Sequence, residues 1–365
     1  INIYVMENSK MVDTYSLKIG GLRINELFEE SLDSPKDYVQ VIREYLTPFF
    51  ETLSDAIPEK LSQCIVSGNE IQTIASMCNA TNSLDFSIME RTAFTKMYKK
   101  AKEKGTEAIS MEYDIPQEEV EVLLPSLIVL NRLLKYTVND SILLSNVLLS
   151  DAVMFEMLFP KEASFVVKAY EEFTLQSATS IAERFGRDLD HISRVSSVAL
   201  EIYDKMKKLH GYKLRERTLL QVSAILQDIG KYVNVKNHAL LSYNTITNLD
   251  IVGINDHERL IIATVCYYHN GNIPSMDSPI YNQLSQEDRV MVSKLAAILQ
   301  ISNAINTSHS PKFEQVNVNM KNGKLNIYLT TLKNINLEKW AFIAKSKLFR
   351  EVYGLNATII KRGVL

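Results

Sequence analysis

The spacing of apolar and polar residues changes along the chain, and each change predicts a different kind of element. Residues 1–6 and 11–17 alternate between apolar and polar positions, which predicts two strands joined as a hairpin. Gly20 and Gly21 turn the chain into a predicted helix that runs through residue 28, and after Ser34-Pro35 the apolar residues recur at helical spacing over residues 38–53. A short apolar run at 64–66 predicts a buried strand that leads into a helix at 71–78. We expect residues 85–158 to be helical apart from one strand at 142–145.

From residue 162 onward the pattern is almost entirely helical. Residues 191–206 carry an apolar stripe along one face, whereas residues 215–229 are apolar nearly all round and predict a buried core helix ended by Gly230. Two more helices are expected at 258–268 and 286–301. The chain closes with a predicted hairpin over 313–330, a helix over 337–353 and a strand over 356–361.

These patterns predict an α+β protein that is predominantly α, with three domains at 1–160, 161–310 and 311–365. The last of them is a small β-β-α-β unit. The first residues, Ile1-Asn2-Ile3-Tyr4, already belong to the first predicted strand, so we expect that a further N-terminal portion precedes them.

The bulk composition excludes several functional classes. A content of 46% hydrophobic and 23% charged residues is that of an ordinary globular protein. A net charge of −3 provides no general attraction to nucleic acid or to a membrane surface. The most apolar run, residues 120–134, is interrupted by polar residues and is too short to span a bilayer. Three distant cysteines without a C-x-x-C pair indicate reduced thiols, and we expect a cytoplasmic protein.

Candidate chemistry gathers in the middle of the helical region. Its polar and charged members are His191, Arg194, Gln227, Asp228, Lys231, His238, His269 and Asn303. They belong to the phrases Ile181-Ala-Glu-Arg184-Phe-Gly, His191-x-x-Arg194-Val, Ala224-Ile-Leu-Gln-Asp-Ile-Gly-Lys, Asn237-His238, Tyr268-His269 and Ser308-His309. In order and spacing, residues 177–310 resemble the HD-type all-helical domain of the exopolyphosphatase and guanosine pentaphosphate phosphohydrolase (Ppx/GppA) family.

The first 160 residues resemble the second lobe of that family's actin-like (ribonuclease H-like) fold. The resembling phrases are Ser16-Leu-Lys-Ile-Gly-Gly-Leu-Arg and Ile65-Val-Ser-Gly68, together with residues 145–149. We expect the family's first lobe, with its catalytic glutamate, to be missing from this chain. The resemblance implies hydrolysis of phosphoanhydride bonds in polyphosphate or guanosine pentaphosphate with Mg²⁺, by a homodimer. The alternative is a catalytically silent homologue that serves as an anion-binding, nucleotide-binding, regulatory or interaction module.

Two ligand positions of the HD-type centre differ from the resemblance. Gln227 stands where it implies a histidine, and Asn303 where it implies an aspartate. Because a two-metal centre needs anionic and imidazole ligands, we expect that the metal of this centre is lost. Three interpretations stay open: polar residues that satisfy one another, a single-metal site, or a metal-free phosphate or nucleotide pocket. Asp228, expected in the last turn of its helix, needs a cationic partner such as Lys231 or Arg194.

The phosphate loops implied by the resemblance are altered as well. The first comprises Ser67, Gly68, Asn69 and Glu70, and the second Ser145, Ser150 and Asp151. The Glu70 carboxylate either repels an incoming phosphate or simply stabilises the start of its own helix. The second loop lacks the arginine that would neutralise phosphate. We therefore expect a degenerate active site.

One basic cluster lies between two helices of the helical region. It comprises Lys205, Lys207, Lys208, Lys213, Arg215 and Arg217. It is either a patch for a polyanion such as polyphosphate, or a solvated helix end whose lysine stems cover apolar surface.

Overall fold

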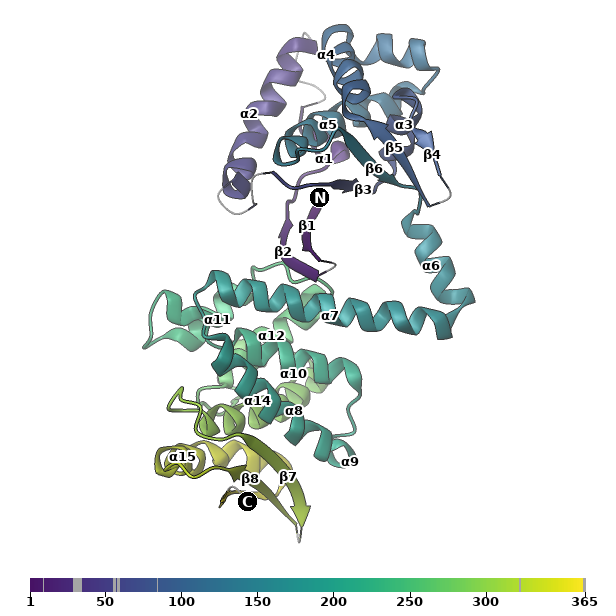
Figure 1. The fold of residues 1–365 in the computed structure, drawn as a ribbon. Helices are drawn as coiled ribbons and strands as arrows, with labels where there is room; N and C mark the ends of the chain where they lie inside the picture. Colours follow the sequence, from purple (N-terminus) through teal and green to yellow (C-terminus); the bar gives the residue numbers. More distant parts are fainter. Residues whose placement is uncertain are drawn as a thin grey trace. The chain divides into compact units, whose positions relative to one another are not determined.

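The computed structural model describes residues 1–8, 10–28, 35–54, 57, 60–83, 85–321 and 323–363. The chain divides into two compact units (Figure 1). Unit 1 comprises Ile1–Val5 and Tyr15–Val166, and unit 2 comprises Met6–Thr14 and Val167–Leu365. The chain is mostly helical with small sheets, in agreement with the predicted α+β class. The division into three domains stays a prediction.

Unit 1 combines helices with a four-stranded sheet. Its elements are β3 (Cys64–Val66), β4 (Thr81–Asn82), β5 (Phe86–Glu90), β6 (Ser141–Ser145), α1 (Gly21–Phe28), α2 (Pro35–Ser54), α3 (Glu70–Met77), α4 (Arg91–Tyr113), α5 (Gln117–Leu133), the 3₁₀ turn η1 (Leu134–Tyr136) and α6 (Leu149–Leu158). The predicted N-terminal hairpin is present as β1 (Asn2–Glu7) and β2 (Lys10–Ser16), whose residues are divided between the two units.

The sheet of unit 1 has the strand order β3-β6-β5-β4. β3 and β6 run parallel in the register Val66↔Leu144, and β5 pairs antiparallel with β6 along its whole length. The prediction that residues 85–158 hold a single strand is therefore wrong. The segment Phe86–Glu90 alternates between exposed and buried positions, with Ser87 and Met89 inside, and its pairing with β6 makes it a strand.

The core of unit 1 is built largely from α2 and α5. Helix α5 buries residues at helical spacing, among them Val120, Leu123, Leu124, Leu127 and Ile128. Helices α1, α2 and α4 all pack against it. The carboxyl ends of β3 and β6 stay at one edge of the sheet because the two strands are parallel.

Unit 2 is a helical domain with a small three-stranded sheet. Its elements are α7 (Pro160–Arg184, shared with unit 1), α8 (Leu189–Lys205), α9 (Lys207–His210), α10 (Leu214–Leu226), η2 (Ile229–Tyr232), α11 (His238–Ile246), α12 (Asp256–Tyr268), α13 (Pro279–Asn282), α14 (Gln286–Ile305), β7 (Gln315–Lys321), β8 (Lys324–Thr330), α15 (Asn336–Tyr353) and β9 (Asn356–Arg362).

Helices α8, α10, α12 and α14 surround the core of unit 2, and α15 packs on α14 while β7 packs on α8 (Figure 1). The sheet has the order β7-β8-β9, with β8 and β9 parallel. The predicted hairpin, helix and last strand of this region are confirmed, and Gly354 ends α15 in the left-handed conformation (φ 65°). Among the described residues, no helix is long and apolar enough to cross a membrane.

One predicted boundary near the candidate chemistry is wrong. Helix α10 ends at Leu226, three residues before the predicted end at residue 229, and the 3₁₀ turn η2 follows. Asp228 therefore lies between the two elements, with φ −108° and ψ 6°, instead of in the last turn of the helix.

Candidate functional site

The junction between α10 and η2 places Asp228 and is held by Ser242 of α11. The Gly230 N–H donates to Ser242 Oγ over 2.9 Å, and the Ser242 hydroxyl donates to the carbonyl oxygen of Gln227 over 2.8 Å. Both bonds are buried, so they satisfy backbone groups that the end of α10 would otherwise leave unpaired. The first residue of α11, His238, is thereby brought beside Asp228.

The Asp228 carboxylate is buried, with 5% of the residue exposed, and its cationic partner is Lys231. Lys231 Nζ lies 2.7 Å from Asp228 Oδ2. Burial alone would raise the pKa of Asp228, but His269 and the Lys231 ammonium together hold that pKa well below its usual range. The other expected partner, Arg194, has an Nε atom with no hydrogen-bond partner among the described residues.

Two histidines face the second oxygen of this carboxylate. His238 Nε2 lies 3.6 Å and His269 Nε2 3.3 Å from Asp228 Oδ1, and the two Nε2 atoms are 3.3 Å apart. His238 is buried at the start of α11, and His269 is fully buried where α12 ends. A capping box fixes the start of helix α12: the side chains of Asn255 and Glu258 each accept the other's backbone N–H.

His191 lies on the other side of Asp228. The side chain of Asp188 caps α8 and accepts the backbone N–H of His191, which fixes that residue in the first turn. Its Nε2 is 3.7 Å from Asp228 Oδ2, and its Nδ1 is 2.8 Å from Asn306 Nδ2. The ring stacks on His309 at 3.9 Å between centroids. Burial and the neighbouring His309 lower the pKa of His191 to about 4, so this imidazole is neutral at pH 7.

The two altered positions differ in their surroundings. Gln227 is almost completely buried, and neither atom of its amide has a hydrogen-bond partner among the described residues. Asn303 is half-buried in α14, and its carbonyl oxygen accepts the N–H of Asn306.

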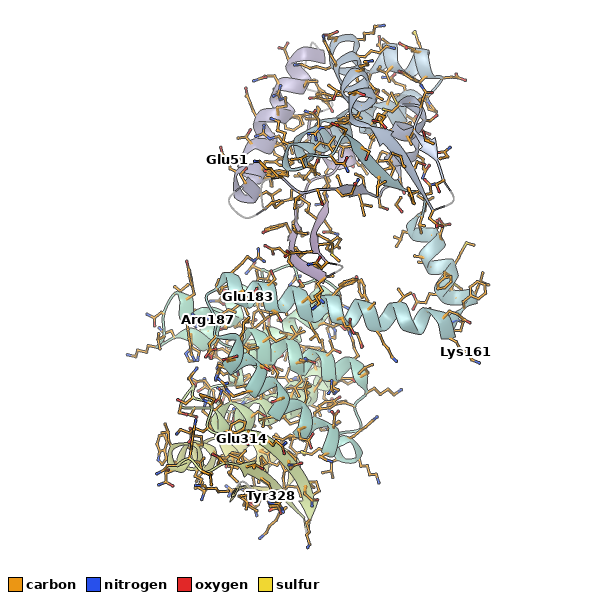
Figure 2. All side chains as sticks on the ribbon, in the orientation of Figure 1. Glu51, Lys161, Glu183, Arg187, Glu314 and Tyr328 are labelled. Carbon is orange, nitrogen blue, oxygen red and sulfur yellow. The ribbon has the colours of Figure 1, made fainter. Side chains whose placement is uncertain are left out.

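Three residues that our sequence analysis did not select also reach this cluster. Asn306 directly follows α14 and Lys345 belongs to α15, and the half-buried Lys345 ammonium is close enough to be influenced by both Asp228 and Lys231. Burial lowers the pKa of Lys345. Arg187, labelled in Figure 2 just beyond the end of α7, donates to the carbonyl oxygen of Asp228 over 3.4 Å. The Ser308-His309 phrase was a signal for the loop after α14, but the sequence contains no comparable signal for Lys345.

Buried polar atoms without a hydrogen-bond partner concentrate around Asp228. Those in this part of unit 2 are His191 Nε2, Arg194 Nε, both amide atoms of Gln227, Asp228 Oδ1, Asn306 Oδ1 and Ser308 Oγ. Unpaired buried polar atoms cost about 1–3 kcal/mol each, so such a concentration indicates a place where water, an ion or a ligand binds.

The two predicted phosphate loops lie at one edge of the sheet in unit 1. Residues 67–70 follow β3, and residues 146–151 follow β6, whose last residue is Ser145; the two strands are parallel neighbours. Gln72 Nε2 donates to the carbonyl oxygen of Ser145 over 3.4 Å and links the loops. Glu70 is the first residue of α3, and Asn69 makes no side-chain cap there. In the second loop the Asp151 carboxylate accepts the Leu148 N–H over 2.8 Å.

The predicted basic patch is partly neutralised by acidic neighbours. Arg215 forms an ion pair with Glu258, and Arg217 pairs with Asp204 at 2.9 Å. Lys205 lies 3.9 Å from Glu201. Lys207, Lys208 and Lys213 form no ion pair with any residue that the structure describes.

A family model identifies the helical part of the chain. Residues 175–348 match the model described as Ppx/GppA phosphatase, domain III. This part of the chain belongs to the Ppx/GppA phosphatase family. The matched range includes every residue of the Asp228 cluster, from Arg187 to Lys345.

Solved structures of Ppx/GppA proteins match the chain at low identity. An exopolyphosphatase from Cytophaga hutchinsonii is 16% identical, with a TM-score of 0.36, over 43% of this chain and 53% of its own. The Ppx/GppA family member of Aquifex aeolicus is 17% identical, with a TM-score of 0.35, over 44% and 53% of the two chains. This chain thus spans about half the length of these solved structures.

We tested which side chains fit the Mg²⁺ that the Ppx/GppA resemblance implies. Among the described residues, Asp228, His238 and His269 form the one group of three side chains whose potential metal-ligand atoms all lie within 4.8 Å of one another. Mg²⁺ prefers an octahedron of oxygen ligands, and two imidazoles do not match that preference. Among the described residues, the acidic groups at the sheet edge, Glu70 and Asp151, do not form such a group.

Proposed function

We propose that this chain is part of a phosphatase that hydrolyses phosphoanhydride bonds of polyphosphate or guanosine pentaphosphate. The observation that carries the proposal is the match of residues 175–348 to a domain of a phosphatase family. The homodimer and the cytoplasmic location expected from the sequence belong to the same proposal.

The sheet edge of unit 1 is the part of this chain that we assign to the phosphates, as the second lobe of an actin-like fold. Loops 67–70 and 146–151 both follow the carboxyl ends of parallel strands, where α/β sheets bind ligands. The start of α3 presents backbone N–H groups that Asn69 does not cap with its side chain, although the Ile71 N–H is bonded to the Gly68 carbonyl oxygen over 3.3 Å. Mg²⁺, when bound with the substrate, neutralises phosphate charge.

Two carboxylates at the same edge favour a second candidate, a silent homologue that binds an anion, a nucleotide or another protein. Asp151 accepts a backbone N–H at the start of α6, and Glu70 lies in the first turn of α3. A carboxylate in the first turn interacts well with the helix dipole and repels an incoming phosphate. If this repulsion prevents productive binding, the protein has kept the fold and lost the turnover.

Phosphate release by the full-length protein separates the two candidates. We expect release from long-chain polyphosphate or guanosine pentaphosphate in the presence of Mg²⁺ or Mn²⁺. Glu70→Gln removes one negative charge beside the substrate and should raise kcat/KM about fivefold, since an exposed charge contact amounts to roughly 1 kcal/mol. Glu103→Gln, an exposed acid on α4, is the matched control and should leave kcat/KM unchanged.

Two results would decide for the silent homologue. The first is no phosphate release from the wild type or either variant with either metal. The second, measured on the same samples, is a higher melting temperature in the presence of polyphosphate or a guanine nucleotide, which shows that binding remains.

A further inference from the structure

We propose that Asp228, His238 and His269 bind a divalent transition-metal ion through Asp228 Oδ1 and the two Nε2 atoms. This inference goes beyond the proposed function, which assigns phosphate chemistry to the sheet edge of unit 1. The sequence left a polar core, a single-metal site and a metal-free pocket open for this cluster. The geometry favours the single-metal site.

The first argument is the tautomer of each histidine. His238 Nδ1 lies 2.8 Å from the carbonyl oxygen of Val235, and His269 Nδ1 is hydrogen-bonded to the carbonyl oxygen of Cys266. A carbonyl oxygen accepts and cannot donate, so each Nδ1 carries the hydrogen of its ring. An imidazole whose single hydrogen is on Nδ1 has a lone pair on Nε2. A carbonyl that holds the distal N–H is the usual outer contact of a metal-binding histidine.

The second argument is that, with a single hydrogen on each ring at Nδ1, no hydrogen lies between the three atoms, so a hydrogen bond from His269 to Asp228 would need a second proton on that ring. The two Nε2 atoms are 3.3 Å apart, and Asp228 Oδ1 lies 3.6 Å from His238 Nε2 and 3.3 Å from His269 Nε2. Asp228 Oδ1 is buried and has no hydrogen-bond partner in the described part of the chain. Three electron-rich atoms this close repel one another in a buried site unless a positive charge lies among them.

The third argument is that the spacing matches the edges of a coordination tetrahedron. With metal–ligand bonds of about 2.0–2.1 Å, two ligands of a tetrahedral ion lie about 3.3–3.4 Å apart, against about 2.9 Å for neighbours in an octahedron. The observed separations of 3.3, 3.3 and 3.6 Å agree with the tetrahedral value. A small ion therefore fits among the three atoms without rearrangement of the side chains.

The donor set indicates the class of metal. Two imidazole nitrogens and one carboxylate oxygen suit Zn²⁺, Co²⁺, Mn²⁺ or Fe²⁺, whereas Mg²⁺ and Ca²⁺ prefer oxygen alone. Three protein ligands leave a fourth tetrahedral position for water or a substrate oxygen, which is the arrangement of a catalytic rather than a structural zinc site.

Lys231 limits the affinity of the proposed site. Its ammonium lies 2.7 Å from Asp228 Oδ2, the carboxylate oxygen that does not face the histidines. The ammonium therefore leaves Oδ1 for the metal while it repels a dication and withdraws charge from the carboxylate. Removal of this ammonium should tighten metal binding, an effect that an incidental surface site would not show.

Metal content of the tag-free full-length protein tests the proposal. After removal of metal with a chelator, the protein is dialysed against Zn²⁺, with Mg²⁺ in a parallel sample. We expect one equivalent of bound Zn²⁺ and no retained Mg²⁺. Asp228→Asn and His238→Gln should lose that equivalent of Zn²⁺. The control variant, His257→Gln on the exposed face of α12, should keep it. Lys231→Met should bind Zn²⁺ about tenfold more tightly than the wild type.

The visible spectrum of the Co²⁺-loaded wild type provides a readout that does not depend on how the variants fold. A tetrahedral Co²⁺ site absorbs strongly, so intense bands that disappear on addition of one equivalent of Zn²⁺ support the proposal. Equal Zn²⁺ uptake by wild type, Asp228→Asn and His238→Gln would overturn it in favour of surface histidines. No Zn²⁺ uptake by the wild type would also overturn it, and would mean that a shared proton bridges the two imidazoles.

Discussion

At the scale of single residues, Gly230 controls how closely η2 approaches α11. A Cβ atom at this position would lie 2.3 Å from the carbonyl oxygen of His238 and 2.5 Å from the backbone nitrogen of Ser242. Both neighbours are backbone atoms of α11, so they cannot move away as a flexible side chain would. The same close approach allows the hydrogen bonds through which Ser242 joins the two segments.

Gly230→Ala should therefore destabilise unit 2 by about 3 kcal/mol, the cost of overpacking against atoms that cannot yield. Gly363→Ala is the matched control, because a Cβ there meets no atom within 4 Å, and it should change stability by less than about 0.5 kcal/mol. Urea unfolding followed by circular dichroism measures both. An alanine variant at position 230 as stable as the wild type would show that α11 shifts freely.

The sequence predicted part of this residue-scale arrangement. Gly230 was expected as a helix end, and the spacing of Asp228 and Lys231 allowed the ion pair that the structure contains. The stacking of His191 on His309 could not be predicted, because it depends on the left-handed conformation of His309 (φ 52°) in the loop after α14. Such contacts result from tertiary packing and leave no local pattern.

At the scale of elements, Arg91 ties the start of α4 to the end of α5 and η1. Its guanidinium donates to the carbonyl oxygens of Leu134, Thr137 and Asn139. Leu134 belongs to η1, whereas Thr137 and Asn139 lie in the segment between η1 and β6, so one side chain joins three carbonyls of this connection.

Arg91→Met should lower the stability of unit 1 by about 2–3 kcal/mol, since three partly buried hydrogen bonds from a charged donor are lost. Arg23→Met is the control, because Arg23 is exposed and makes one long contact of 3.5 Å with the Lys18 carbonyl. Thermal unfolding compares the two variants. Equal effects on stability would refute the role assigned to Arg91.

Helix boundaries were predicted well where the apolar residues recur regularly, whereas a strand that depends on pairing with another strand was missed. Helix α14 begins at the predicted Gln286 because Ser285 caps it through the Asp288 N–H. The strand β5 was missed, since a five-residue alternation is too short to identify without its partner β6. The end of α10 was placed too late because Ile229 continues the apolar pattern although its backbone has already turned into η2.

At the scale of the whole molecule, most helices and strands followed from the sequence, with β5 as an exception, but the composition of the Asp228 cluster did not. Asp228 and His238 are near in sequence, whereas Lys345 joins them from α15. Lys345 comes near the Asp228 charge because α15 packs on α14, which no local pattern shows. The two units also have separate hydrophobic cores, one drawn from residues 5–144 and the other from residues 178–349.

Because the two cores share no residue, we expect the units to unfold in two calorimetric transitions. Arg91→Met should lower the melting temperature of one transition and Gly230→Ala that of the other, by several degrees in each case. Zn²⁺ at 100 times its dissociation constant should stabilise the transition sensitive to Gly230→Ala by about 2.7 kcal/mol, because the proposed ligands all lie in unit 2. The other transition should not respond to Zn²⁺. A single transition that both variants and Zn²⁺ displace together would contradict independent unfolding, since it would require the two cores to lose their structure in one cooperative step.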